Sequence, residues 1–227
     1  EILPVTGPVL TRLRDGTIAG PAGKLEGLLQ EKANHAHDWI ALLCHPHPRF
    51  GGTMHNKVVY RLASVLHDLG AAVLRFNYRG VGKSAGSYDQ GIGELEDARA
   101  ALRWLRERYP YARTTLAGFS FGSWVAARLA ASETAIERMI LVAPPAGTSD
   151  FGVLGTCTVP KLVLHGTRDD QAPLAALERA YPSWAEPKRL IRIEGATHFF
   201  DRQLAALADA LRAGLAEPGG TEASPRP

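Results

Sequence analysis

The sequence has few cysteines and no long apolar run. Its 227 residues include only Cys44 and Cys157, too few for the disulfide framework of a small secreted domain. We expect two free thiols in a reducing compartment, which makes the cytoplasm the default location. No stretch reaches the roughly 18 apolar residues of a membrane span, and no basic and then apolar signal segment opens the chain. Residue 1 is Glu rather than Met, which leaves the true N-terminus open.

The sequence also lacks a strong excess of charge of one sign. Its 26 Lys and Arg residues are interleaved with 23 Asp and Glu residues, for a formal net charge of +3. Nucleic-acid binding usually needs a basic stripe, so we expect no nucleic-acid partner. The apolar share of 45% is ordinary for a globular protein. We expect one domain over residues 1–216. Residues 217–227 have almost no apolar side chain and are predicted to form a mobile tail.

Short apolar runs alternate with longer segments of helical period, the pattern of a mostly parallel sheet with helices on both faces. Six runs have the length and composition of buried strands: Trp39–Cys44, Ala71–Phe76, Thr114–Gly118, Met139–Ala143, Lys161–His165 and Arg189–Ile193. Lys24–Glu31 is a candidate antiparallel strand at the sheet edge. Apolar residues three and four positions apart predict helices over 58–69, 92–105 and 200–215. The chain is therefore predicted to have an α/β fold.

A Gly-x-Ser-x-Gly pattern, residues 118–122, lies between a strand-like run and an apolar helical segment. Alone it is a weak signal, because Gly and Ser are common in turns. A serine hydroxyl is a poor nucleophile until a base accepts its proton, and a sharp strand-to-helix turn exposes it to such a base. The start of the following helix supplies N–H donors for an oxyanion. We predict Ser120 as the nucleophile and the Phe121 N–H as an oxyanion donor.

Candidates for the acid and the base follow the next strands. Asp169 comes after the run 161–165, and His198 comes after the run 189–193. Catalytic groups of open α/β sheets gather at the carboxyl ends of the strands. Taken singly, Asp169 is better explained as a turn or capping carboxylate and His198 as a surface histidine at a helix start. Their order after Ser120 favours a Ser-Asp-His triad. Asp170 is the close alternative for the acid.

Two more strings complete a family pattern: residues 45–57, His-Pro-His-Pro-Arg-Phe-Gly-Gly-Thr-Met-His-Asn-Lys, and residues 75–84, which contain Arg-Gly-x-Gly-x-Ser. With them the chain resembles small capless prokaryotic α/β-hydrolases of the esterase and thioesterase-like kind, from about Leu42 to the final helix. The resemblance implies the α/β-hydrolase fold, with a mostly parallel central sheet and no substantial cap domain. It also favours Asp169 as the acid, through the pattern His-Gly-x-x-Asp-x-x-x-Pro.

The resemblance places the second oxyanion donor after the family's third strand, where the family has His-Gly and this chain has Pro46 in place of the Gly. Proline has no N–H to donate. The N–H of His47 is therefore the first choice for the second donor. The N–H groups of Arg49 and Phe50 are the alternatives.

Other motifs are weaker, and we expect neither a metal nor another cofactor. The histidines between positions 35 and 55 lack the i, i+4 spacing of a helical zinc site. Gly82-Lys83-Ser84 resembles the end of a phosphate-binding loop, but position 77 is Asn where that motif needs Gly. Four aromatic residues are candidates for an acyl pocket, although core packing is expected for at least half of them: Tyr78, Trp124, Phe199 and Phe200.

These residues predict a serine hydrolase that cleaves carboxylic esters or thioesters of small acyl substrates through an acyl-enzyme on Ser120. About 17 residues separate the strands near 143 and 161, too few for a helical cap, so an open pocket is expected. A haloalkane-type displacement would need Asp at position 120. Two alternatives remain, a peptidase or amidase with the same triad and a non-catalytic ligand-binding member of the fold. We expect no membrane partner, and a monomer or a homodimer.

Overall fold

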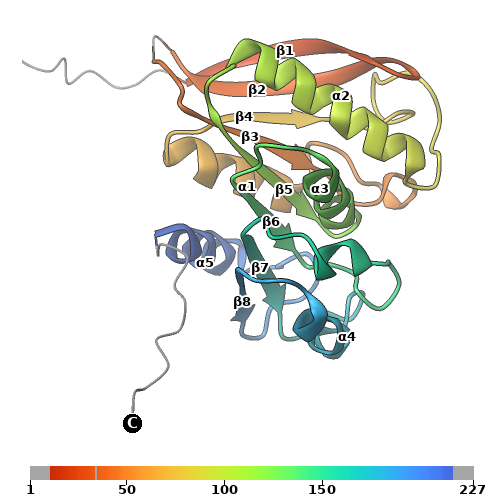
Figure 1. The fold of residues 1–227 in the computed structure, drawn as a ribbon, viewed down its shortest axis with the longest axis vertical. Helices are drawn as coiled ribbons and strands as arrows, with labels where there is room; N and C mark the ends of the chain where they lie inside the picture. The colour runs from red at the N-terminus through yellow and green to blue at the C-terminus, as the bar shows by residue number, and fades with distance from the viewer. Residues whose placement is uncertain (1–10, 34, 217–227) are drawn as a thin grey trace, which may run out of the picture.

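The computed structural model describes residues 11–33 and 35–216. They contain one eight-stranded sheet with the order β1-β2-β4-β3-β5-β6-β7-β8 (Figure 1). The six strands from β4 to β8 in this order run parallel, and β2 pairs antiparallel with both β1 and β4. The strands are β1 (Thr11–Gly20), β2 (Gly23–Lys32), β3 (Trp39–Cys44), β4 (Ala72–Phe76), β5 (Arg113–Phe119), β6 (Arg138–Val142), β7 (Lys161–Gly166) and β8 (Lys188–Ile193).

Helices cover both faces of this sheet (Figure 1). The helices α1 and α5 pack on one face, and α2 and α3 pack on the other. The bounds are α1 (Lys57–Asp68), α2 (Ile92–Arg108), α3 (Phe121–Ser132), α4 (Leu174–Ala180) and α5 (Leu204–Ala216), with short 3-10 turns η1 (Pro48–Phe50), η2 (Gly152–Gly155) and η3 (Tyr181–Ser183). This arrangement confirms the predicted fold class.

Each face of the sheet has its own apolar core. Under α1 and α5, Leu62, Leu66 and Leu211 are fully buried with strand residues. Under α2 and α3, Leu105 and Leu129 are fully buried in a second cluster. Burying a leucine side chain contributes about 1.5 to 3 kcal/mol. The helix periodicity seen in the sequence thus corresponds to the faces that cover the sheet.

The six predicted central strands are confirmed to within a residue or two, but the predicted edge is wrong. The segment 24–31 does form an antiparallel strand, β2, yet it lies inside the sheet between β1 and β4. The true edge strand is β1, which the sequence analysis missed. Its sequence, TRLRDGTIAG, has charged and glycine residues in place of an apolar run. Its pairing comes from the hairpin with β2.

The last helix begins later than predicted. Periodicity placed its start near Phe200, whereas α5 starts at Leu204. Phe200 and Arg202 have φ values of 53° and 60°, which a right-handed helix does not allow. His198 therefore lies in the turn before the helix and not at its first residue. The predicted tail 217–227 lies outside the described residues.

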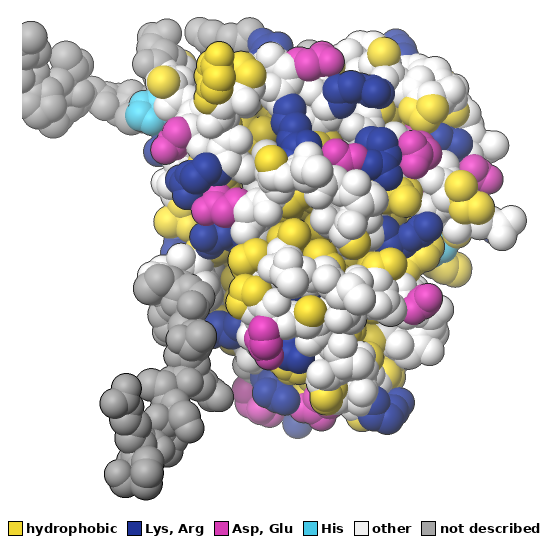
Figure 2. Space-filling model, in the orientation of Figure 1, with side chains coloured by type: hydrophobic (Ala, Val, Ile, Leu, Met, Phe, Trp, Pro, Cys, Tyr) yellow, Lys and Arg dark blue, Asp and Glu magenta, His cyan; other side chains and the backbone are white. Residues whose placement is uncertain are grey.

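The connection from β6 to β7 contains only the η2 turn, and no helical cap is present there among the described residues. Cys44 and Cys157 are both free and buried. In the described part of the chain, no helix has the length and apolar character needed to cross a membrane. On the face shown in Figure 2, Lys and Arg side chains are interspersed with Asp and Glu.

Candidate active site

Ser120 lies in a sharp turn between β5 and α3. Its φ and ψ are 53° and −122°, a strained conformation for a residue with a side chain. Both flanking glycines are required by close backbone approach. A Cβ on Gly118 would lie 2.1 Å from the carbonyl oxygen of Gly122, and a Cβ on Gly122 would lie 2.1 Å from that of Cys44. The turn therefore presses the start of α3 against the end of β3 and leaves the Ser120 side chain partly exposed.

The structure brings Ser120, His198 and Asp169 into one hydrogen-bonded chain. The His198 Nε2 lies 3.0 Å from the Ser120 Oγ, and its Nδ1 lies 2.8 Å from the Asp169 Oδ2. Both His198 and Asp169 are buried. With the Nδ1–H donating a hydrogen bond to the carboxylate, Nε2 is free to accept the serine proton. The His198 ring packs against both Phe119 and Phe199, with ring centroids 5.1 and 5.2 Å away, and these two rings also contact each other.

Asp169, and not Asp170, makes the contact with His198. The Asp169 carboxylate also accepts the N–H groups of Gln171 and Ala172 on Oδ1, at 3.0 and 2.7 Å. These bonds fix the carboxylate and leave Oδ2 facing the imidazole. Asp170 is exposed on the same loop. The structure thus separates the two carboxylates that the sequence left as alternatives.

The N–H groups of Phe121 and His47 make no hydrogen bond to any other residue that the structure describes. The two alternative donors are already engaged. The N–H of Phe50 donates to the His47 carbonyl at 3.1 Å, and the N–H of Arg49 donates to the His47 Nδ1 at 3.2 Å. Backbone N–H groups free of partners are what an oxyanion hole requires. This contrast favours His47 over Arg49 and Phe50 as the second donor.

A buried histidine that the sequence analysis did not single out controls the peptide before His47. His45 is fully buried, and its Nε2 accepts the N–H of Tyr78 at 3.2 Å. Its Nδ1 then carries the proton and donates to the Pro46 carbonyl at 2.7 Å. Burial lowers the pKa of His45 to about 3, so the ring is neutral at pH 7. The only sequence signal for this role was the position of His45 between a predicted strand and a proline.

The comparisons with known proteins agree with this fold. A family model described as the alpha/beta hydrolase fold matches residues 47–159. A solved alpha-beta serine hydrolase homologue from Coxiella burnetii is 38% identical, with a TM-score of 0.86 over 92% of this chain and 100% of that chain. An uncharacterized protein of Rickettsia prowazekii is 40% identical over 190 residues, 80% of this chain and 79% of its own length. The chain belongs to the α/β-hydrolase family.

A solved serine hydrolase without a lid, from Xanthomonas campestris, is also similar to this α/β-hydrolase. It is 37% identical, with a TM-score of 0.83 over 93% of this chain and 100% of that chain. The family and these neighbours indicate that the chain is a hydrolase. The short connection between β6 and β7 agrees with the absence of a lid in the Xanthomonas protein.

The Arg-Gly-x-Gly-x-Ser segment of this α/β-hydrolase is held in place beside the site by its own side chains. The Arg79 guanidinium donates to both carboxylate oxygens of Asp97, which raises the pKa of Arg79. The Ser84 hydroxyl donates to the Asn77 carbonyl at 2.7 Å. The Asn77 side-chain oxygen in turn accepts the N–H of Met54 at 2.8 Å. These bonds join the segment 77–84 to the loop that carries His47.

The four candidate pocket aromatics divide into two pairs. Tyr78 and Phe200 are fully buried in the core, whereas Trp124 and Phe199 are partly buried. The expectation that at least half of them serve core packing is therefore confirmed. Two further rings, Phe50 and Tyr88, pack against His47 and were not assigned to a pocket from the sequence. Phe50 lies in the string of residues 45–57, where only its backbone N–H was considered, and Tyr88 lies in no motif.

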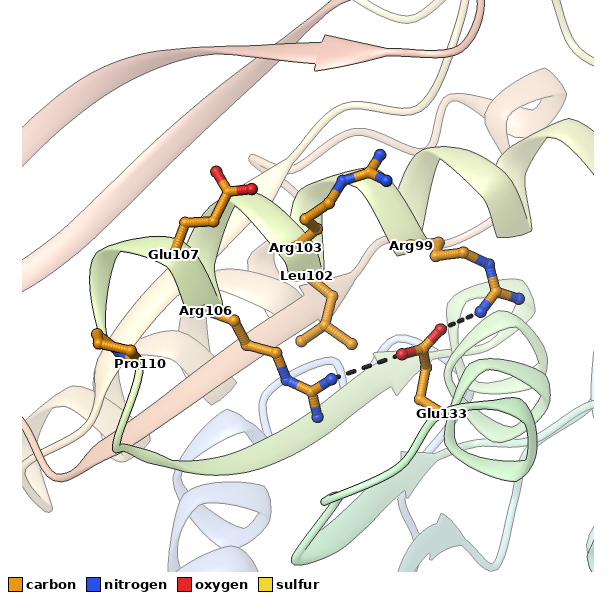
Figure 3. A pocket seen from close by; sticks show the side chains of 7 residues that line it. All are labelled: Arg99, Leu102, Arg103, Arg106, Glu107, Pro110 and Glu133. Carbon is orange, nitrogen blue, oxygen red and sulfur yellow. Dashed lines mark hydrogen bonds and ion pairs between the residues drawn. The ribbon is translucent and has the colours of Figure 1, made fainter.

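Two hollows of this α/β-hydrolase lie away from the triad. One, of about 450 Å³, is lined by residues of α2 and by Glu133 after α3 (Figure 3). Arg99 and Arg106 both point to Glu133 and form ion pairs with it. These pairs balance the charge of Glu133 inside the hollow. Among the described residues, no group of three or more His, Cys, Asp or Glu side chains is arranged to hold a metal ion.

Proposed function

We propose that this hydrolase is a serine esterase that cleaves carboxylic esters or thioesters of small acyl substrates, with Ser120, His198 and Asp169 as its catalytic triad. The observation that carries the proposal is the unbroken hydrogen-bonded chain from the Ser120 Oγ through His198 to Asp169. A buried carboxylate that accepts a hydrogen bond from the Nδ1–H stabilises the imidazolium as it forms. The strained turn at Ser120 supports the same assignment, because such strain clusters at functional sites.

In the first half-reaction, His198 accepts the Ser120 proton while Oγ forms a bond to the acyl carbon. The C–O or C–S bond of the substrate then breaks, and the proton on His198 passes to the leaving alcohol or thiol. In the second half-reaction, His198 takes a proton from water, the hydroxide adds to the acyl carbon, and the carboxylic acid leaves as Oγ regains its proton. The N–H groups of Phe121 and His47 stabilise the negative oxygen in both halves.

An open rim favours small or extended acyl groups over a lipid substrate that needs a lid to move. An amidase with the same triad is the second candidate, and it predicts turnover of a p-nitroanilide at a rate comparable with the matching ester. A non-catalytic member of the fold predicts no reaction of Ser120 with a fluorophosphonate. The two buried free thiols suit a cytoplasmic protein. We expect a monomer or a homodimer.

The test is hydrolysis of p-nitrophenyl acetate and butyrate by the wild type and by Ser120→Ala. Ser132→Ala is the matched control, because Ser132 lies exposed at the opposite end of α3. We expect Ser120→Ala to lose on the order of a thousandfold or more in rate, and Ser132→Ala to keep the wild-type rate. Equal activity of the wild type and Ser120→Ala would reject Ser120 as the nucleophile. If the wild type is inactive, fluorophosphonate labelling of Ser120 separates a wrong substrate from a silent site.

A further inference from the structure

Five aromatic rings form a continuous cluster next to Ser120, in which Phe50 is exposed, Phe121 is buried and the other three rings are partly buried. We call this cluster the aromatic shelf and define it by the side chains of His47, Phe50, Tyr88, Phe121 and Trp124. The His47 ring is central, with centroid distances of 4.7 Å to Phe50, 5.1 Å to Tyr88 and 4.9 Å to Phe121. Trp124 extends the shelf, with its ring 5.6 Å from that of Phe121. Three of the five rings come from loops and two from the start of α3.

The shelf is continuous with the proposed catalytic site. Phe121 follows Ser120 directly, and His47 and Phe121 carry the two unpartnered N–H groups. The shelf therefore borders the oxyanion side of Ser120. His198, which protonates the leaving group, belongs to a different set of rings with Phe119 and Phe199. A substrate whose leaving group faces His198 directs its acyl group away from that ring, toward the shelf.

Phe50, at the outer end of the shelf, is far more exposed than the phenylalanines of the core. Phe50 is 83% exposed, whereas Phe76 and Phe119 are fully buried. The Arg49 guanidinium lies 5.9 Å from the centre of the Tyr88 ring. It forms no ion pair with a carboxylate of the described residues. An exposed phenylalanine beside an unpaired planar cation offers two surfaces on which a flat ring can stack.

The shelf is already built without a ligand. The His47 carbonyl accepts the N–H groups of Phe50 and Gly52, both at 3.1 Å. The His47 Nδ1 accepts the N–H of Arg49, so the neutral ring carries its proton on Nε2 and donates it to the Tyr88 hydroxyl at 3.2 Å. Burial and the neighbouring Arg49 lower the pKa of His47 and keep it neutral. Pre-organised rings lose little freedom when a substrate binds.

We propose that the aromatic shelf binds the acyl part of the substrate, and that the preferred substrates are esters of aromatic carboxylic acids. This inference rests on the proposed esterase function and makes its substrate class specific. The hydrolysis follows the steps given above, with water supplying the second oxygen of the released aromatic acid. An aliphatic acyl group of the same size fills the same space but does not stack with the rings or with the guanidinium.

The experiment compares p-nitrophenyl benzoate with p-nitrophenyl cyclohexanecarboxylate, which have the same leaving group and acyl parts of similar size. The measured quantity is the ratio of kcat/KM for the two esters. Phe50→Leu keeps an apolar side chain but removes a ring, and Tyr88→Leu removes a second. Tyr111→Ala is the control, because Tyr111 is an aromatic residue 97% exposed in the turn before β5.

We expect the benzoate to cyclohexanecarboxylate ratio to fall about threefold in Phe50→Leu and about tenfold in the double variant, and to stay unchanged in Tyr111→Ala. Activity that depends on Ser120 but shows the same ratio in every variant would reject the shelf and leave the esterase proposal standing. If the wild type hydrolyses no ester and Ser120 is not labelled, the esterase proposal fails. Saturation-transfer NMR then tests the shelf alone, and equal binding of benzoate to the wild type and to Phe50→Leu overturns it.

Discussion

The Nδ1 of His45 lies 2.7 Å from the carbonyl oxygen of Pro46. This bond matters because the Pro46 carbonyl and the His47 N–H belong to one planar peptide, in which they point in opposite directions. Holding the carbonyl toward His45 therefore fixes the direction of the N–H that we assign to the oxyanion hole. The Tyr78 N–H donates to the His45 Nε2. The ring proton is therefore on Nδ1, which donates to the Pro46 carbonyl. His45 is thus a positioning residue that acts through the His47 peptide.

His45→Phe removes the donor but keeps an aromatic ring against Tyr78, whose centroid is 4.3 Å from that of His45. We expect kcat to fall about tenfold to a hundredfold with little change in KM, because a misdirected oxyanion donor weakens binding of the transition state only. Fluorophosphonate labelling reports whether Ser120 is still presented. The control is His67→Phe, which replaces another buried histidine, on α1. An unchanged kcat in His45→Phe would contradict the positioning role.

The same buried histidine makes stability depend on pH. Its pKa is about 3 in the folded protein and about 6.5 in an unfolded chain. Between these values the unfolded chain binds a proton that the folded protein does not, so stability falls as the pH falls. His45 alone should account for a loss of about 2 kcal/mol between pH 7 and pH 5. Urea unfolding at pH 7 and pH 5 measures this change in unfolding free energy. In His45→Phe the change should be about 2 kcal/mol smaller than in the wild type.

The sequence predicted the parts of this protein whose physics is local. Buried parallel strands need continuous apolar runs, so the central strands were recognised with nearly correct ends. The Ser120 turn was recognised because part of its glycine requirement is local: a Cβ on Gly118 would meet the carbonyl oxygen of Gly122 within the turn. The position of Asp169 after one strand and of His198 after the next followed from the geometry of a parallel sheet.

Of the missed features, β1 depends on its hairpin partner and the other two depend on partners distant in sequence. Strand β1 has a polar sequence, and only its pairing with β2 makes it a strand. The role of His45 depends on the Tyr78 N–H, 33 residues away. Tyr88 joins the shelf only because its loop folds over the η1 turn and meets His47. No periodicity or spacing in one sequence encodes these contacts.

The two neighbouring carboxylates allow a paired test of the triad. Asp169→Asn keeps a side-chain oxygen for the N–H groups of Gln171 and Ala172, but it no longer offers a charged acceptor to His198. We expect the rate of ester hydrolysis to fall about 10³- to 10⁴-fold. Asp170→Asn should keep the wild-type rate, because its side chain is exposed. Equal losses in the two variants would show that the loop, rather than the Asp169 carboxylate, is what matters.

The close packing at Gly122 makes a prediction about both fold and activity. In Gly122→Ala the new Cβ would lie 2.1 Å from the carbonyl oxygen of Cys44, a backbone atom at the end of β3 that a side-chain rotation cannot relieve. The start of α3 must move, which shifts Ser120 away from His198. We expect a loss of more than about 2 kcal/mol in unfolding free energy, as for other overpacked sites, together with loss of esterase activity.

Gly155→Ala is the control, because its Cβ would meet the Ser183 carbonyl oxygen at an ordinary 3.5 Å. Unfolding in urea and p-nitrophenyl butyrate hydrolysis by both variants separate the two effects. A stable, fully active Gly122→Ala would mean that the turn tolerates the displacement and that its geometry does not set the position of the nucleophile.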